Sequence, residues 1–265
     1  FSLIEPLIEI DASVSGNTDI DFNKGHQQID FTIHEKNLNI TNPQSDLKIF
    51  VYQNNNRNDV RTDIQPMTIT DKQLQYKHNR KLIFEAGNEY RRIEFLSHRY
   101  DGMGVEEIGF YHPYYHATLF QEKKRANTSY LYDQDQNGRF FIRCSECREP
   151  DTEADYYIVH FSLVSERMEG GDVYITGDLF NNILDNRNRM EYNNETGAYE
   201  KAVMLKQGLY NYQYLIRSLN VHSTSAIEGN YFETENEYSV LVYYRPAGQR
   251  YDSLIGYTSL QSRKK

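Results

Sequence analysis

The spacing Asp133-x-Asp135-x-Asn137-Gly138 comes closest to a metal site in this chain. Carboxylate and amide oxygens at alternating positions, followed by a glycine, open a calcium-binding loop of the twelve-residue type. Such a loop ends in a bidentate glutamate, whereas the twelfth position here is Cys144. The competing interpretation is a hairpin turn at Asn137-Gly138, because both residue types accept a positive φ. Apart from this calcium, which the turn interpretation disfavours, the sequence predicts no cofactor.

Two further groups of side chains are candidates for contact with a partner. The acidic run Glu233, Glu235 and Glu237 precedes a strong strand and could meet a basic surface or hold a cation. A solvated loop is the competing interpretation. The other group is Phe180, Asn181 and Asn182, in a loop between two predicted strands.

The remaining polar residues predict no catalytic centre. His112 and His116 flank a Pro-Tyr-Tyr bend, and no nearby acid completes a ligand set, which favours surface or hydrogen-bonded histidines. Arginines 91, 92 and 245 are expected in ion pairs, with Glu89, Glu94 and Asp252 as acceptors. The chain has no nucleophile elbow, no glycine-rich phosphate loop and no H-E-x-x-H motif. We therefore expect a protein that is not an enzyme.

Composition limits the class of partner. The 38 acidic residues exceed the 29 basic ones and give a net charge of −9, so nucleic acid is not an expected partner. No apolar run approaches the ~20 residues of a membrane-spanning helix, so no transmembrane segment is predicted. The chain begins at Phe1, which suggests a processed product or a fragment. Cys144 and Cys147 form the single C-x-x-C, and a local disulfide or two idle thiols is the expected state.

The elements that position these residues are strands. Tyr (23) and Phe (13) favour pleated, half-buried surfaces, and apolar residues alternate with polar ones over many short segments. Ile29, Phe31 and Ile33, for example, share one face of a strand. No segment of helical length has a 3.6-residue period. The predicted fold class is all-β, with two immunoglobulin-like antiparallel β-sandwich domains at residues 1–150 and 151–265. The boundary is the charged segment 144–154, which contains Pro150.

The second half resembles glycogen-binding carbohydrate-binding modules, which have an early-set immunoglobulin-like fold. The shared residues begin with Val173, Gly177, Asp178, Phe180, Asn181 and Asn182, and continue with Gly208, Tyr210, Tyr212 and Tyr214. Where that family carries its sugar-stacking tryptophan, this chain has Ile183, and it contains no tryptophan at all. The three tyrosines fall on one strand face and are expected to point inward, leaving Asn211 and Gln213 outside. The resemblance implies the fold but not the sugar site, so glycan is a disfavoured partner.

The whole chain resembles the plug protein family of the type IX secretion system of Bacteroidetes bacteria. The motifs that carry this resemblance are 85–92 (EAGNEYRR), 132–140 (YDQDQNGRF), 154–156 (ADY), 177–178 (GD), 234–238 (TENEY), 242–246 (VYYRP), 250–252 (RYD) and 254–256 (LIG). The first 80 residues match more loosely, and family members usually carry a further amino-terminal region. The resemblance implies a non-enzymatic, periplasmic or outer-membrane-associated protein that contacts a large outer-membrane translocon. The alternative is a non-catalytic, glucan-type carbohydrate-binding module.

Overall fold

The computed structural model describes residues 6–15, 24–219 and 221–263, and they form an all-β protein. Its α-helices in this part of the chain are single turns of four residues each: α1 (Pro43–Asp46), α2 (Pro150–Glu153) and α3 (Ser225–Glu228). Two 3-10 turns, Arg80–Leu82 and Asp178–Phe180, accompany them. The predicted all-β fold class is confirmed.

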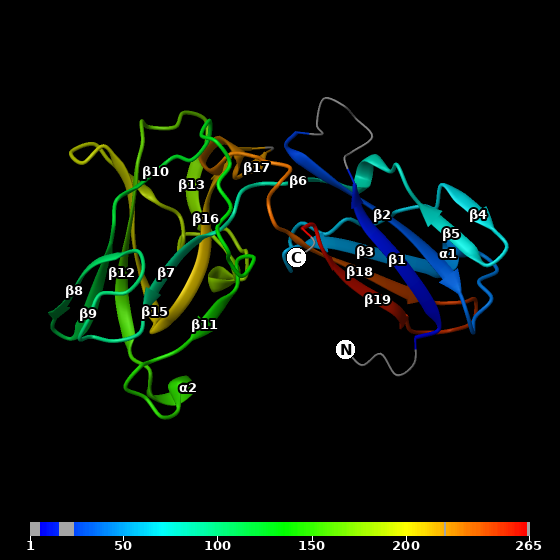
Figure 1. Ribbon diagram of the computed structural model, residues 1–265, viewed down its shortest axis with the longest axis horizontal. Helices are drawn as coiled ribbons and strands as arrows, with labels where there is room; N and C mark the ends of the chain where they lie inside the picture. The colour runs from blue at the N-terminus through cyan, green and yellow to red at the C-terminus, as the bar shows by residue number, and fades with distance from the viewer. Residues whose placement is uncertain (1–5, 16–23, 220, 264–265) are drawn as a thin grey trace. The chain divides into compact units, whose positions relative to one another are not determined.

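The chain divides into two compact units, and the second is inserted into the first. Unit 1 combines Phe1–Gly87 with Asn230–Lys265, and unit 2 is Asn88–Gly229. In Figure 1 the blue and cyan strands form one unit with the orange and red strands, whereas the green and yellow strands form the other.

The predicted division at residues 150/151 is therefore wrong. The charged segment that suggested it is a connection within unit 2, between strands β11 (Phe140–Ile142) and β12 (Tyr156–Val164). Its polarity reflects exposure rather than a domain boundary. The true junctions lie at Gly87 and Gly229, both at positive φ (66° and 87°). The turn at residues 86–88 is one of these junctions.

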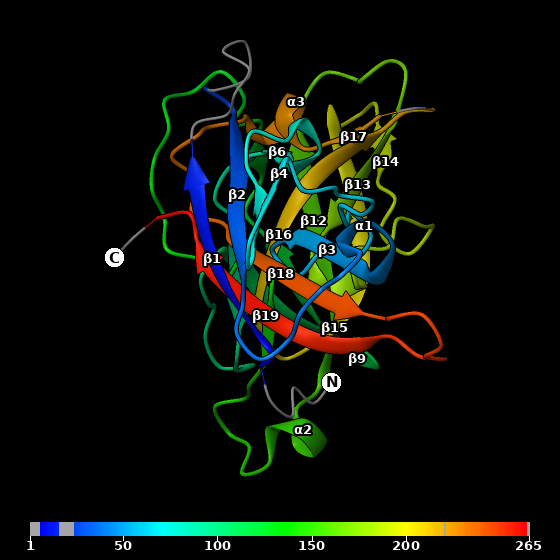
Figure 2. The ribbon, with the colours of Figure 1, turned by 90° about the vertical axis from the view of Figure 1, so that its right-hand side faces the viewer.

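Unit 1 is a sandwich of two sheets. The first has the order β1 (Ile8–Ser15), β2 (His26–Glu35), β5 (Gln73–Tyr76), β4 (Thr68–Thr70), with β6 (Ile83–Glu85) also paired to β2. The second has the order β19 (Ser253–Gln261), β18 (Glu237–Tyr244), β3 (Leu47–Gln53). In Figure 2 the blue strands β1 and β2 cross the orange and red strands β18 and β19 obliquely. Since β18 pairs with β3 along its length, the carboxyl-terminal strands complete the amino-terminal sandwich.

The core of unit 1 follows the predicted alternation. Ile29, Phe31 and Ile33 are buried between the sheets, and Phe31 stacks on Tyr76 with ring centroids 4.5 Å apart. Burying each such side chain stabilises the fold by about 1.5–3 kcal/mol relative to leaving it exposed.

Unit 2 is also a sandwich. One sheet has the order β14 (Glu191–Asn193), β15 (Ala198–Lys206), β12 (Tyr156–Val164), β9 (Tyr114–Leu119), β8 (Val105–Tyr111), with β10 (Glu122–Lys123) beside β12. In the other, β16 (Gly208–Arg217) pairs with β7 (Arg91–Phe95), β11 (Phe140–Ile142), β13 (Asp172–Thr176) and β17 (His222–Ser223). The first sheet is mixed, because β9 and β10 run parallel to β12, which the expectation of purely antiparallel sheets missed.

Candidate functional site

The predicted calcium residues lie in one loop of unit 2, but their oxygens serve other partners. Asp133 forms an ion pair with Arg92 at 2.6 Å. Asp135 accepts hydrogen bonds from the backbone N–H of Tyr90 and, at 2.7 Å, of Asn137. Asn137 and Gly138 have φ values of 54° and 82°, as a tight turn requires. No cluster of three metal-ligating side chains occurs in the described ranges.

The predicted contact residues are divided between the two units, and one of them is buried. Phe180 is a core residue of unit 2, only 7% exposed, so its assignment to a contact loop is wrong. It is buried because the 3-10 turn Asp178–Phe180 folds the ring inward. Asn181 and Asn182 follow in the left-handed region, and Asn182 Nδ2 donates to Asp178. Gly177 has φ 144°, and a Cβ there would meet the Asn211 carbonyl at 2.8 Å.

The acidic run Glu233, Glu235 and Glu237 belongs to unit 1, and its side chains are exposed or half-buried. The residues between the glutamates are the buried ones. Asn236 donates to the carbonyl of Ala86 at 2.8 Å, and its Oδ1 accepts from the side-chain amide of Asn54 at 2.7 Å. The TENEY motif therefore fixes the start of β18, and the glutamates are its outward side.

A buried charge network in unit 2 was not predicted. Glu228, with no exposed side-chain surface, accepts from Arg91 Nε at 3.0 Å, from Arg125 Nε at 2.8 Å and from the backbone N–H of Tyr214 at 2.8 Å. Arg91 also pairs with Glu122 at 3.0 Å. Burial lowers the pKa of Arg91, but Glu228 and Glu122 raise it more, so the guanidinium stays charged. The expected acceptors Glu89 and Glu94 were wrong for Arg91, whereas the pair Arg245–Asp252 was correct.

The tyrosines of β16 point inward, as expected. Tyr210, Tyr212 and Tyr214 are buried, and the last two hydroxyls donate to Glu122. The expectation that Asn211 and Gln213 lie outside is wrong, because this second face is covered as well. Asn211 accepts from the backbone N–H of Gln136 at 2.5 Å, and Gln213 donates to the Asn88 carbonyl at 2.6 Å.

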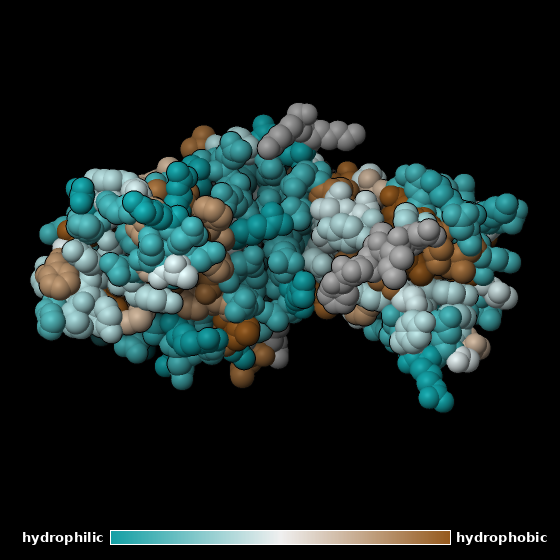
Figure 3. Space-filling view, turned by 90° about the horizontal axis from the view of Figure 1, so that it is seen from below, coloured by the Kyte–Doolittle hydropathy of each residue, from teal (hydrophilic) through white to brown (hydrophobic). Residues whose placement is uncertain are grey.

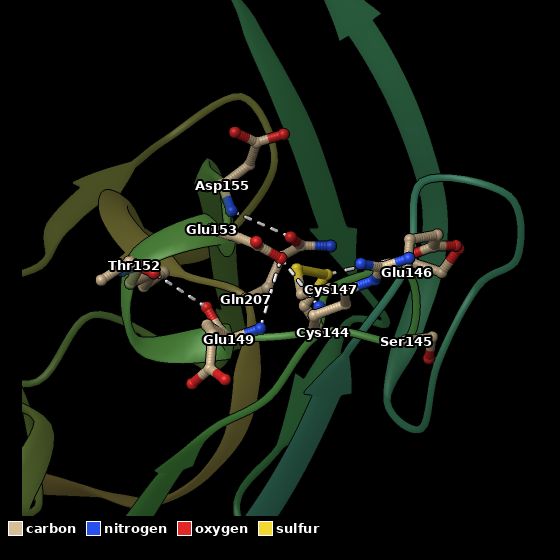
Figure 4. Close-up of a disulfide and its surroundings, with 12 residues drawn as sticks. Cys144, Ser145, Glu146, Cys147, Glu149, Thr152, Glu153, Asp155 and Gln207 are labelled. Atoms are coloured by element: carbon tan, nitrogen blue, oxygen red, sulfur yellow. Dashed lines mark hydrogen bonds between the residues drawn. A yellow bond between two sulfur atoms is a disulfide. The ribbon is translucent and has the colours of Figure 1, made fainter.

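Cys144 and Cys147 form a disulfide, which Figure 4 shows beside α2. The loop packs on the segment after β7, where Ser145 N–H donates to the Leu96 carbonyl at 2.9 Å. The segment that follows is held by Glu153, which accepts from the backbone N–H of Arg148 at 2.7 Å. The disulfide thus shapes a local turn, as one of the two sequence interpretations expected.

The most distinctive exposed feature of unit 2 is the outer face of its β8–β9–β12–β15 strands. Tyr111 (64% exposed), Tyr114 (41%) and Tyr156 (53%) lie at one end of this face, and we call them the tyrosine row. Tyr111 pairs with Tyr114 across the β8–β9 hairpin, and Lys206 Nζ lies 5.7 Å from the centre of the Tyr156 ring. Along β12, the same face continues with Ile158 and then His160.

A polar groove of about 1080 Å³ extends this outer face beyond His160. Its lining includes Glu106, Ser162, Asn193 and Glu200. Glu200 is fixed by Asn193 Nδ2 at 3.0 Å and by Thr196 Oγ1 at 2.7 Å. Hydrophilic side chains also dominate the face of the molecule drawn in Figure 3, where hydrophobic residues form small separate groups. The three exposed tyrosines in one row form the candidate contact site of unit 2.

Comparison with known proteins shows a shared fold but no activity. The chain is similar to a crystal structure of a hypothetical protein from Parabacteroides merdae ATCC 43184, with 59% sequence identity and a TM-score of 0.93. The match covers 97% of this chain and 66% of that protein. No protein-family model and no curated protein matches the chain. None of the described helices is long and apolar enough to cross a membrane.

Proposed function

We propose that the protein is a non-enzymatic binding protein of the bacterial periplasm or outer membrane, similar to the plug component of the type IX translocon. It acts by contact with a larger outer-membrane protein complex. The motifs spread from residue 85 to residue 256 support this proposal. Several of them build the two sandwiches: Arg91 enters the Glu228 network, and Asn236 fixes the start of β18. They support a shared scaffold, and one of them, 154–156, also contributes Tyr156 to the tyrosine row.

The tyrosine row is the observation on which the proposed contact surface rests. Tyr111, Tyr114 and Tyr156 expose their rings on adjacent strands, and Met204 extends the exposed apolar surface on β15. Tyrosine and methionine are enriched in protein interfaces. Tyrosine buries a large area with few rotatable bonds, and the flexible methionine side chain adapts to the surface of the partner. Strand β8 is the edge of its sheet, so part of its backbone is also open to a partner strand, although the Ile108 N–H already donates to Asp101.

The disulfide supports the compartment. Disulfides persist in the periplasm and outside the cell and are rare in the reducing cytosol. Both cysteines of the chain are used in this bond.

Affinity capture from solubilised outer membranes tests the proposal. The full-length protein should retain a defined outer-membrane complex, and the double variant Tyr114→Ser/Tyr156→Ser should lose most of it. Tyr257→Ser is the matched control, because this tyrosine is equally exposed (50%) on β19 of unit 1. Capture that is unchanged by the double variant, or lost equally in the control, rejects the tyrosine row as the contact site.

A glycan-binding function is the second candidate, and the same row is the observation that favours it. Exposed tyrosine rings on a sheet face can stack on sugar rings. Titration calorimetry with maltoheptaose distinguishes the two. Binding tighter than about 1 mM, or roughly 4 kcal/mol, that is abolished by Tyr114→Ser/Tyr156→Ser would replace the protein-contact proposal with a glycan-binding one.

A further inference from the structure

Two histidines meet diagonally on the outer face of unit 2. His116 follows Tyr114 on the same face of β9, and His160 follows Tyr156 and Ile158 on the same face of β12. His116 is on β9 and His160 on β12, adjacent strands in Figure 1. His116 Nδ1 lies 2.8 Å from His160 Nε2. The ring centroids are 5.1 Å apart and the planes differ by 18°. Because 2.8 Å is shorter than the ~3.5 Å contact of stacked faces, the rings meet edge to edge.

The facing nitrogens share one hydrogen, since a neutral imidazole has one donor nitrogen and one acceptor nitrogen. If the donor ring moves its hydrogen to its other nitrogen through solvent, both facing atoms present lone pairs and the pair stays neutral. Two such lone pairs on adjacent strands form a chelate for a metal ion that prefers imidazole. We propose that His116 and His160 bind a divalent first-row transition ion, with Cu²⁺ and Ni²⁺ preferred.

The nitrogen separation favours these two ions. Bonds of ~2.0 Å at a right angle, as in the square-planar geometry of Cu²⁺ or Ni²⁺, place the two nitrogens ~2.8 Å apart. Tetrahedral Zn²⁺ with bonds of about 2.0–2.1 Å needs ~3.3 Å between them. The first separation is already present, so a square-planar ion needs less displacement of the two nitrogens than a tetrahedral one.

The rest of the environment suits an open site. Tyr111 packs edge-on against His116, with ring centroids 5.2 Å apart. Within the described segments no group of three metal-ligating side chains forms, so the other coordination positions go to water or an incoming ligand. The polar groove begins at His160 and gives solvent access to this side. No free cysteine competes for the ion.

Calorimetric titration of the whole chain with CuCl₂, NiCl₂, ZnCl₂ and MgCl₂ tests the proposal. We expect one Cu²⁺ per chain, affinity in the order Cu²⁺ over Ni²⁺ over Zn²⁺, and no binding of Mg²⁺. Either His116→Gln or His160→Gln should weaken Cu²⁺ at least tenfold. His112→Gln, at the tip of the same hairpin, is the matched control and should leave the affinity unchanged.

A second readout separates coordination from nonspecific binding. Electron paramagnetic resonance of the Cu²⁺ form should show coupling to two imidazole nitrogens in the parent chain and to fewer in either variant. Unchanged melting temperatures of the metal-free variants would show that they fold. The proposal is overturned if the Cu²⁺ affinity and spectrum persist in the double variant His116→Gln/His160→Gln. It is also overturned if the parent chain binds no Cu²⁺.

Discussion

Replacing Glu228 by glutamine should strongly destabilise unit 2. The side chain is fully buried, and three donors converge on it: Arg91, Arg125 and the backbone N–H of Tyr214. Glutamine has nearly the same shape, so the substitution leaves no cavity. It offers one acceptor oxygen in place of two, and its amide N–H₂ group faces other donors.

The expected magnitude follows from the buried ion pair. Removing one partner of such a pair costs about 3–5 kcal/mol, because the other charge stays buried without compensation. Arg91 keeps Glu122, which places the loss near the lower end, at about 3 kcal/mol. For a unit of this size, about 3 °C per kcal/mol converts the loss to a fall of roughly 10 °C in melting temperature.

Differential scanning calorimetry measures this fall, and two further variants sharpen it. Arg187→Gln breaks the exposed pair with Asp185 in the same unit and should leave the melting temperature unchanged. Arg91→Met combined with Glu228→Gln should cost less than the sum of the two single changes, because the two residues share one interaction. A fall below about 3 °C for Glu228→Gln would refute the view that this network stabilises unit 2.

Three further predictions concern the disulfide, the acidic loop and the histidine pair. Cys144→Ser/Cys147→Ser should cost no more than about 2 kcal/mol, because the bond closes a very short loop; a larger loss in denaturant titration would give it a global role. Calcium should not raise the melting temperature, since Asp133 is paired with Arg92, and a chelator-reversible rise abolished by Asp133→Ala would contradict this. Burial and the neighbouring His116 lower the pKa of His160 in the folded chain below its value in the unfolded chain, about 6.5. As the pH falls through about 6.5, the unfolded chain therefore takes up a proton before the folded chain does. The melting temperature should therefore fall as the pH drops below about 6.5, and it should fall less steeply in the His160→Asn variant. An equal slope of melting temperature against pH in both chains would exclude His160 as a source of the pH dependence.

The sequence predicted the strands well and their partners poorly. The alternation of Ile29, Phe31 and Ile33 identified a core strand, because burial on one face is a local property. The pairing of β3 with β18 is non-local, and no local pattern reports it, so the predicted domain boundary fell inside unit 2.

The same limit applies to the candidate sites. A single strand shows which residues share a face, but not whether a second layer covers the opposite face, and Gln213 was therefore misplaced. Glu228 does not lie in a segment of alternating polar and apolar residues that would predict its burial. The one feature of the local sequence that marks this position is the neighbouring Gly229. His116 and His160 are far apart in sequence and meet only because β9 and β12 pair in parallel. Residue types that could bind ligands or react can be found in the sequence, but whether they come together depends on strand register.

Site-specific photo-crosslinking tests the proposed contact most directly. A photoreactive phenylalanine analogue at position 156, in the full-length protein in cells, should give a defined adduct with an outer-membrane protein, and the same analogue at position 257 should not. Adducts of equal yield from both positions, or none from position 156 while the protein lies in the periplasm, would contradict the assignment of the tyrosine row as the contact surface.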